Sequence, residues 1–425
     1  DQSRLSSLAR IQHLGTRCKN ISRAGDASDA RARVARPMSA ATIDCRVSGP
    51  WWHAKNHPMS GVTLWRWIET LWRHRASIDF VRFAPRLALV TTLSVFNTLG
   101  AIGDGALWAF GWRKTRVRDD PVFIVGHPRT GTTHTHNVMA KDSGRFGAAR
   151  TFDVGFPSGF LSSGFMMPML GGLMDTTRPM DNMELSMETP QEDELGTNQL
   201  SACASPYASL MFMRDEEKFR KFYTLREDDE AYPIERRELE RWKSAFMTFV
   251  RKLQYRCGED KRLVLKSPVH CARVKLLKEM FPRAQFIFIS RHPYDVFKSS
   301  VNMADKYYWQ CYLQQPTVEQ VQEYILRQGE ILHDAYVRDS KLLPRDALYE
   351  IRFDELDADL MGTMEKLYAH FGWDNFDADV KPVLKEYAES LTNFKKNSFS
   401  TLSDDAKKLV QTRWKRWFTD LNYDM

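Results

Sequence analysis

Near residue 121 an apolar strand leads directly into a glycine-containing loop, and this combination narrows the folds open to the chain. Residues 121–125 read Pro-Val-Phe-Ile-Val, the loop Gly126-His-Pro-Arg-Thr-Gly-Thr-Thr133 follows at once, and a stretch compatible with a helix covers about 132–141. Small residues let backbone N–H groups close around phosphate oxygens, and a helix N-terminus adds positive potential. The order of strand, loop and helix predicts a phosphate-binding loop; a purely structural turn is the alternative.

Further apolar strands recur downstream, and each is followed by a helical segment. The strands are expected at residues 262–265, 285–290 and 348–353. Long helices are expected at residues 234–256, 317–339 and 357–371. Strands that alternate with helices indicate a parallel sheet with helices on both faces. We therefore predict an α/β fold with a P-loop-type central parallel sheet flanked by helices, preceded by an N-terminal helical extension.

Charge and composition set the first 58 residues apart from the rest. Residues 1–50 hold nine Arg or Lys against four Asp and are rich in Ser and Ala, as an organelle transit peptide is. A disordered leader, upstream of a start at Met38 or Met59, is the alternative. The other 375 residues hold 52 basic against 50 acidic side chains, so bulk charge gives no case for nucleic-acid binding. We expect an organellar protein if the leader is a transit peptide, and otherwise an intracellular, membrane-associated, Golgi-type location.

A helical extension is expected at residues 59–113, before the large α/β domain at 114–425. Residues 61–83 form an amphipathic pattern with an aromatic face and an Arg-rich face. Residues 87–103 carry no charge, but a spanning helix needs about 20 apolar residues. We predict a buried or interfacial helix there, with a membrane span as the alternative, and a possible membrane-surface contact through residues 61–112.

Cysteine and histidine spacing gives no sign of a metal site. The six Cys are scattered, without a Cys-x-x-Cys pair or a Cys/His ligand spacing. The simplest interpretation is unpaired thiols in a reducing compartment, with no metal; disulfides in a Golgi-type lumen are the alternative.

The glycine loop differs from a Walker A loop in the position of its cation. The residue after the second glycine, which is the phosphate-binding Lys of P-loop kinases and ATPases, is Thr132 here. A cation stands inside the loop instead, as Arg129. We expect a phosphate site that works without a metal. Its candidate binding residues are Arg129, Thr130, Gly131, Thr132 and Thr133.

A second anion site is expected at the end of the strand 285–290. Arg291 follows this strand directly, and Ser299 comes eight residues later, in a segment expected to form the first turns of a helix. An Arg at a strand end and a Ser on the next helix can converge on one phosphate. Two phosphate sites on one sheet suit a nucleotide that is phosphorylated at both its 5′ and its 3′ positions.

These motifs together resemble the family of sulfotransferases that depend on 3′-phosphoadenosine 5′-phosphosulfate (PAPS). In that family a loop like Pro128 to Thr133 cradles the 5′-phosphosulfate, and an Arg and a Ser placed like Arg291 and Ser299 bind the 3′-phosphate. The segment Leu265-Lys-Ser-Pro-Val-His270 is also similar to a family element. Segments 178–183 and 190–194 resemble a branch with an added N-terminal hydrophobic helix. The resemblance covers about residues 85–425 and implies PAPS as co-substrate, no metal, and a catalytic domain at 114–425.

The resemblance also implies which groups stabilise the leaving phosphate. Charge gathers on the bridging oxygen, so positioned cations and N–H dipoles should stabilise it. Arg129 and the N–H groups of Thr130 to Thr133 are the first candidates. Lys266 is the next, because tyrosylprotein-type relatives carry a Lys at the matching position; a surface cation is the alternative.

The acceptor hydroxyl needs a general base. Many soluble relatives use a His two residues after the matching Lys, but that position is Pro268 here. Tyrosylprotein-type relatives use a Glu on the strand after the first helix, where Asp153 falls, so Asp153 is the first candidate. Glu192 and Glu194 are the second. The alternatives are a capping carboxylate for Asp153 and a solvated acidic face for the other two.

The acceptor itself is not identified by any motif. Residues 154–176 are rich in Met, Phe and Gly and lie where relatives place acceptor-contacting loops, which suits a lipophilic alcohol; a carbohydrate is the alternative. Lys395 and Lys396 could close over the 3′-phosphate.

A P-loop nucleotide kinase or phosphotransferase is the main competing function, but it would need a loop Lys and an Asp that holds Mg²⁺. A non-catalytic, membrane-associated nucleotide-binding protein is the third.

Overall fold

Five strands build the centre of the protein, and all four pairings between them are parallel. They are β1 (Val122–Val125), β2 (Phe146–Ala148), β3 (Arg262–Lys266), β4 (Gln285–Ser290) and β5 (Leu348–Arg352). Their order in the sheet is β2-β3-β1-β4-β5. This computed structural model describes residues 46, 49, 56–172, 175–178, 180–391 and 401–425.

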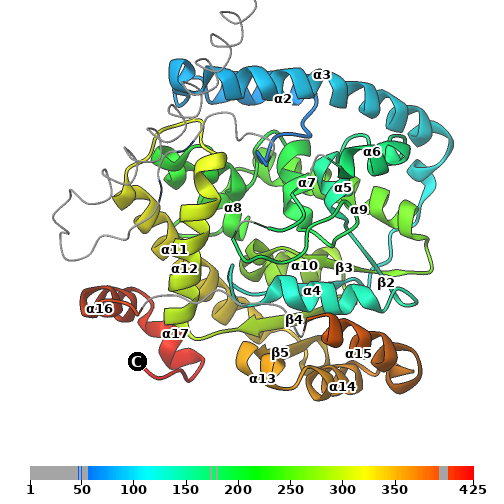
Figure 1. Cartoon of the computed structure of the whole chain (residues 1–425), viewed down its shortest axis with the longest axis vertical. Helices are drawn as coiled ribbons and strands as arrows, with labels where there is room; N and C mark the ends of the chain where they lie inside the picture. Colours follow the sequence, from blue (N-terminus) through cyan, green and yellow to red (C-terminus); the bar gives the residue numbers. More distant parts are fainter. Residues whose placement is uncertain (1–45, 47–48, 50–55, 173–174, 179, 392–400) are drawn as a thin grey trace, which may run out of the picture. The chain divides into compact units, whose positions relative to one another are not determined.

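Alternating side chains of each strand serve two separate cores, because successive residues of a strand point to opposite faces. Val122 and Ile124 pack against α4 (Thr132–Lys141), α13 (Phe353–Ala358), α14 (Leu360–Phe371) and α15 (Lys381–Ser390). Phe123 and Val125 belong to the larger core with α9 (Arg236–Cys257), α10 (Val274–Met280) and α12 (Val318–Asp339). Helices therefore cover both faces of the sheet, and the predicted α/β fold is confirmed (Figure 1).

Shorter helices connect these layers. They are α5 (Thr151–Gly155), α6 (Met167–Gly171), α7 (Asp193–Leu200), α8 (Lys221–Thr224), α11 (Pro293–Lys306), α16 (Asp404–Arg413) and α17 (Lys415–Asp420). The predicted helices at 234–256 and 317–339 agree with α9 and α12 within two residues. The helix predicted at 357–371 is two helices, α13 and α14, because the backbone leaves the helical conformation at Asp359, whose side chain caps α14.

The N-terminal extension folds into two helices whose bounds differ from the prediction. Helix α2 covers Leu64–Arg73 and α3 covers Phe80–Phe110, so the apolar helix is longer than residues 87–103. Among the described residues, α3 contains one stretch, Phe80–Ala109, that is long and apolar enough to cross a membrane, and 22% of its most apolar part is buried. Most of the predicted leader, residues 1–58, lies outside the described residues, as do Lys395 and Lys396.

The register of the sheet brings three strand ends together. Ile124 of β1 stands beside Lys266, the last residue of β3, and Val125 stands beside Phe288 of β4. Ligands of open parallel sheets bind outside the carboxyl ends of the strands, where the strand order reverses. The glycine loop after β1, Lys266 and Arg291 after β4 therefore share one edge of the sheet.

Candidate active site

The glycine loop turns sharply between β1 and α4. Gly126, Arg129 and Gly131 all have positive φ angles, of 151°, 75° and 104°. A Cβ atom at Gly126 would lie 2.6 Å from the carbonyl oxygen of Ile289. Any residue with a side chain would therefore clash with β4 at this position, so the close approach requires glycine. Thr130 donates from its Oγ1 to the carbonyl oxygen of His127 at 2.8 Å and pins the turn. The loop therefore ends on the N-terminus of α4, which favours anions.

Three side chains predicted to bind phosphate meet beside this loop. Arg129 donates from Nε to Ser299 Oγ at 3.0 Å, across 170 residues of sequence. Arg291 donates from Nη1 to the carbonyl oxygen of Arg129 at 3.3 Å, and its guanidinium lies over the ring of Phe353. Asp181 forms an ion pair with Arg129 at 3.0 Å. The two anion sites expected from the sequence are thus contiguous.

Lys266 links the loop to Glu192. Its side chain is fully buried, and Nζ lies 2.9 Å from Glu192 Oε1 and 3.3 Å from Thr133 Oγ1. Arg178 donates to the same Thr133 hydroxyl at 3.2 Å. Burial lowers the pKa of Lys266, while the charge of Glu192 opposes this shift. Lys266 therefore lies inside the site, which disfavours the alternative of a surface cation.

Glu192 is held by a tyrosine that the sequence did not reveal. The Tyr207 hydroxyl donates to Glu192 Oε2 and lies 3.1 Å from Ser267 Oγ. Burial alone would raise the pKa of Glu192, but Lys266 and the hydrogen bond from Tyr207 hold it below its ordinary value. Burial and the charge of Glu192 raise the pKa of Tyr207 well above its ordinary range. At neutral pH the pair therefore consists of a carboxylate and a neutral phenol.

A cavity of about 320 Å³ lies beside Glu192. Its wall includes Pro128 of the glycine loop and the polar groups Arg178 and Glu192. The apolar part of the wall includes Phe156, Met180, Met187, Leu195, Leu210 and Met303. A mostly apolar wall with a few polar groups at one place is typical of a site for a small organic substrate.

Of the described residues of segment 154–176, which was expected to contact the acceptor, only the first three line the cavity. Val154, Gly155 and Phe156 line the cavity. Phe165 and Met169 point to solvent and are 82% and 64% exposed. The methionines of the cavity come instead from positions 180, 187 and 303, which no local pattern groups together.

Asp153, the first candidate for the base, is engaged elsewhere. It lies in the first turn of α5 rather than on a strand, and its side chain is fully buried. It forms ion pairs with Arg150 at 3.1 Å and with Arg256 at 3.0 Å, and accepts from the Arg150 backbone N–H. Among the described residues, its neighbours Thr151 and Val154 line the cavity and Asp153 does not. These contacts favour the capping alternative for Asp153.

Glu194 is buried behind the site and supports it through hydrogen bonds. It accepts two hydrogen bonds from Arg273, at 2.7 and 3.1 Å, and one from Ser205. Its neighbour Asp193 lies 2.6 Å from His270 Nε2. Both pairs are fully buried, and they tie the first turn of α7 to the 3₁₀ segment Pro268–Arg273, which follows Lys266 almost directly. They therefore fix the elements that carry Glu192 and Lys266.

This buried group also has the spacing of a metal site. Asp193, Glu194 and His270 offer ligand atoms within 4.8 Å of one another. The guanidinium of Arg273 already pairs with Glu194, and His270 Nε2 lies 2.6 Å from Asp193 Oδ1.

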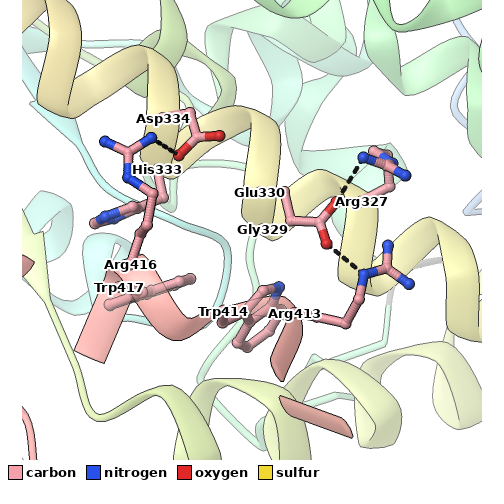
Figure 2. Close-up of a pocket in the computed structure, with 9 residues that line it drawn as sticks. All are labelled: Arg327, Gly329, Glu330, His333, Asp334, Arg413, Trp414, Arg416 and Trp417. Atoms are coloured by element: carbon pink, nitrogen blue, oxygen red, sulfur yellow. Dashed lines mark hydrogen bonds and ion pairs between the residues drawn. The ribbon is translucent and has the colours of Figure 1, made fainter. Parts of the chain in front are cut away.

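The C-terminal helices α16 and α17 contact both α12 and the glycine loop. Trp414 and Trp417 lie 5.7 and 5.0 Å, between ring centroids, from His127 of the loop. A second cavity, of about 240 Å³, is lined by residues of α12 and of the C-terminal helices, as Figure 2 shows. Arg413 pairs with Glu330 and Arg416 with Asp334 across it, so its arginines are matched by carboxylates. We therefore assign this cavity to the contact between α12 and the C-terminal helices, which supports the glycine loop.

Comparison with known proteins decides the family. A family model described as "Sulfotransferase family" matches residues 121–378, which include the glycine loop, Lys266 and Arg291. The chain belongs to the sulfotransferase family. The reaction class is therefore sulfuryl transfer to a hydroxyl group, in place of the phosphoryl transfer of the kinase alternative.

Two mycobacterial relatives are similar along most of their length. The omega-hydroxy-beta-dihydromenaquinone-9 sulfotransferases Stf3 of Mycobacterium bovis and Mycobacterium tuberculosis are each 30% identical to this sulfotransferase over 358 residues. The match covers 84% of this chain and 89% of each relative.

Solved structures agree with the fold. The sulfotransferase STF1 of Mycobacterium tuberculosis superposes with a TM-score of 0.55 at 15% identity, over 82% of this chain and 90% of that one. The sulfotransferase STF9 of Mycobacterium avium gives a TM-score of 0.57 at 14% identity, over 79% and 86%. At these identities the likeness concerns the fold alone.

Proposed function

We propose that this sulfotransferase uses PAPS to sulfate the hydroxyl group of a lipophilic alcohol, with Glu192 as the general base. The observation that carries the proposal is the position of Lys266, whose ammonium contacts both Thr133 of the glycine loop and Glu192 at the cavity wall. A group held on the loop and a hydroxyl in the cavity would thus meet at one buried ion pair.

The residues around the glycine loop fit a nucleotide with two phosphate groups. The loop N–H groups of Thr130 to Thr133 and the N-terminus of α4 suit the 5′-phosphosulfate. Arg291 and Ser299 lie next to Arg129 and suit the 3′-phosphate. When bound, PAPS supplies an electron-poor sulfuryl group on a phosphate leaving group.

Glu192 is placed to accept the proton of the acceptor hydroxyl. Lys266 and Tyr207 keep it ionised, and it lines the cavity, whereas Asp153 is held by two arginines. As the proton moves to Glu192, the acceptor oxygen bonds to sulfur, and the bond from sulfur to the phosphate oxygen breaks. Lys266 and Arg129 then stabilise the charge left on that phosphate oxygen. The products are a sulfate ester and 3′,5′-adenosine bisphosphate.

The cavity favours a lipophilic acceptor over a carbohydrate. Sugars are bound through many hydroxyl partners, whereas three Met, three Leu and Phe156 give this wall an extended apolar part beside its polar residues. Two relatives are named for an omega-hydroxy menaquinone derivative, which agrees with this choice.

Two measurements on the full chain test the proposal. In the first, thermal stability is followed with 3′,5′-adenosine bisphosphate, with ATP plus Mg²⁺, and with 5′-AMP. A ligand specific for the native state raises stability by RT ln(1 + [L]/Kd). We expect selective stabilisation by the bisphosphate. Stabilisation by ATP plus Mg²⁺ alone would point to a kinase-like site and would overturn the donor assignment.

In the second, ³⁵S-labelled PAPS is supplied with long-chain primary alcohols, sterols or simple sugars. We expect label in the alcohols or sterols. Labelling confined to the sugars would reject the lipophilic acceptor and leave the donor assignment intact.

A further inference from the structure

Helices α2 and α3 expose more large apolar side chains than other described parts of the chain. Six of them are at least 64% exposed: Trp65, Trp72, Val81, Phe96, Leu99 and Ile102. The two helices pack against each other and lie along one side of the domain (Figure 1). Exposed apolar surface of this extent marks an interaction site.

The opposite face of α3 is fixed to the domain along its length. Val90 and Ser94 are buried, and Asn97 donates to the carbonyl oxygens of Ser60 and Val62. Near the other end, Asp104 forms a buried ion pair with Lys252 of α9 at 2.6 Å. A helix that packs lengthwise on its own domain cannot cross a bilayer alone, so the exposed face lies parallel to whatever covers it.

Charged side chains lie at both ends of the exposed face of α3, and no exposed charged side chain lies between them. Between Arg86 and Arg113 the sequence contains one ionisable residue, Asp104, which is buried. Exposed cations flank the uncharged stretch, with Arg75 and Arg82 before it and Arg113 and Lys114 after it. A 31-residue helix is about 46 Å long, so the two cationic ends are far apart.

Tryptophans stand beside these cations. The guanidinium of Arg75 lies 4.4 Å from the ring centroid of Trp72, and that of Arg113 lies 5.1 Å from Trp108. Amphipathic aromatic rings next to Lys or Arg are the side chains that membrane interfaces favour.

We propose that α2 and α3 form a docking surface for an anionic lipid bilayer, with α3 lying in the plane of the interface. The apolar stretch enters the boundary between headgroups and acyl chains, and the terminal cations bind acidic headgroups. A second copy of the chain fits this surface less well than a bilayer does. Parallel or antiparallel pairing of two such faces would place cations against cations.

The docking surface adjoins a segment that lines the acceptor cavity, so this inference rests on the proposed function and extends it. His57, Pro58 and Ser60 line the cavity directly before α2, and Asn97 of α3 holds the Ser60 carbonyl. A lipid alcohol held in the bilayer would thus lie close to an element that lines the cavity.

Flotation of the full chain with vesicles tests the docking surface without any nucleotide or acceptor. We expect binding to vesicles of phosphatidylcholine with 30% phosphatidylglycerol, and at least tenfold weaker binding to phosphatidylcholine alone. Wild-type protein that stays unbound with the anionic vesicles would overturn the proposal. Equal binding to both would overturn its electrostatic part, and a dimer in solution that ignores vesicles would assign the face to a second copy.

Matched variants then locate the surface. Phe96→Ser combined with Leu99→Ser should abolish flotation, whereas Leu342→Ser, an equally exposed apolar site elsewhere, should leave it unchanged. Arg82→Gln with Lys114→Gln should remove the preference for anionic lipid. A cooperative unfolding transition near the wild-type melting temperature shows that each variant is folded. If the protein docks but never sulfates a lipid alcohol, the proposed function fails and the docking surface stands.

Discussion

Lys266 Nζ lies 2.9 Å from Glu192 Oε1 and also donates to Thr133 Oγ1 of the glycine loop. One buried cation therefore connects the part of the site suited to a phosphate with the part that faces an apolar cavity. Because an unpaired charge is costly to bury, neither partner can be removed without changing the other. This coupling shapes the first two predictions.

Replacing Glu192 by Gln keeps the shape of the side chain and removes its ability to take a proton. We expect turnover to fall by about 10²-fold or more, the usual size of general-base catalysis. Affinity for 3′,5′-adenosine bisphosphate should stay near that of wild type, which isothermal titration measures. The comparison variant is Asp153→Asn, which should retain turnover per folded molecule. Wild-type turnover in Glu192→Gln together with a loss in Asp153→Asn would return the base to Asp153.

Replacing Lys266 by Met should move the pH dependence of turnover as well as lower it. Lys266 lowers the pKa of Glu192, and burial raises it. Without Lys266 the pKa of Glu192 rises, so a base that must be ionised is lost at a higher pH. The acid limb of the profile of kcat against pH should therefore shift upward. An acid limb that stays in place would show that Lys266 does not act through Glu192.

Local sequence patterns were sufficient for four of the five strands and for the glycine loop, because these features depend on neighbouring residues, but the three-residue edge strand β2 was not predicted. The role of Asp153 was not predictable in this way. Its partner Arg256 is 103 residues away, on α9, and tertiary packing brings the two together. Tyr207 was missed for the same reason, since nothing near it in the sequence indicates a contact with Glu192.

The predicted helix ended at residue 103 because Asp104 closes the uncharged run, but Asp104 is buried in an ion pair with Lys252 and the helix continues. The glycines of this run do not interrupt the helix either. Here they permit close packing instead. A Cβ atom at Gly100 would lie 3.3 Å from the Cα atom of Gly159, and one at Gly103 would lie 2.6 Å from Ser162 Oγ. Tertiary contact therefore overrides the local preference, and the helix continues to Phe110.

Arg291→Gln should weaken binding of the 3′-phosphate selectively. A hydrogen bond to a charged group contributes about 1.5–3 kcal/mol, so we expect affinity for 3′,5′-adenosine bisphosphate to fall roughly 10- to 100-fold. Affinity for 5′-AMP should change little. Arg345→Gln, on an exposed turn, is the control. Equal losses for both nucleotides would place Arg291 at the 5′ end or in the support of the loop.

Arg273→Met should destabilise the fold, because it leaves Glu194 buried without its cation. Breaking a buried pair from one side costs about 3–5 kcal/mol of unfolding free energy. Adding Glu194→Gln should recover part of this loss, since no charge is then left buried. Urea unfolding of both variants measures the effect. A double variant no more stable than Arg273→Met would show that packing, and not charge, dominates at this site.

Buried histidines should make the protein sensitive to mild acid. Burial lowers the pKa of His57, His127 and His136 from 6.5 to about 3. Between these values the unfolded chain binds protons that the folded chain does not. The unfolding free energy must therefore decrease as pH falls through this window, and each histidine contributes up to about 1.4 kcal/mol per pH unit.

A single substitution separates this effect from that of the carboxylates. His136→Gln removes one titrating group, so its stability should fall by about 1.4 kcal/mol less than that of wild type between pH 7.5 and 5.5. The exposed His370→Gln should follow the wild-type curve. Urea unfolding at the two pH values gives the comparison. If His136→Gln and wild type lose the same stability, His136 is protonated in the folded protein, and a partner must then lie beside it.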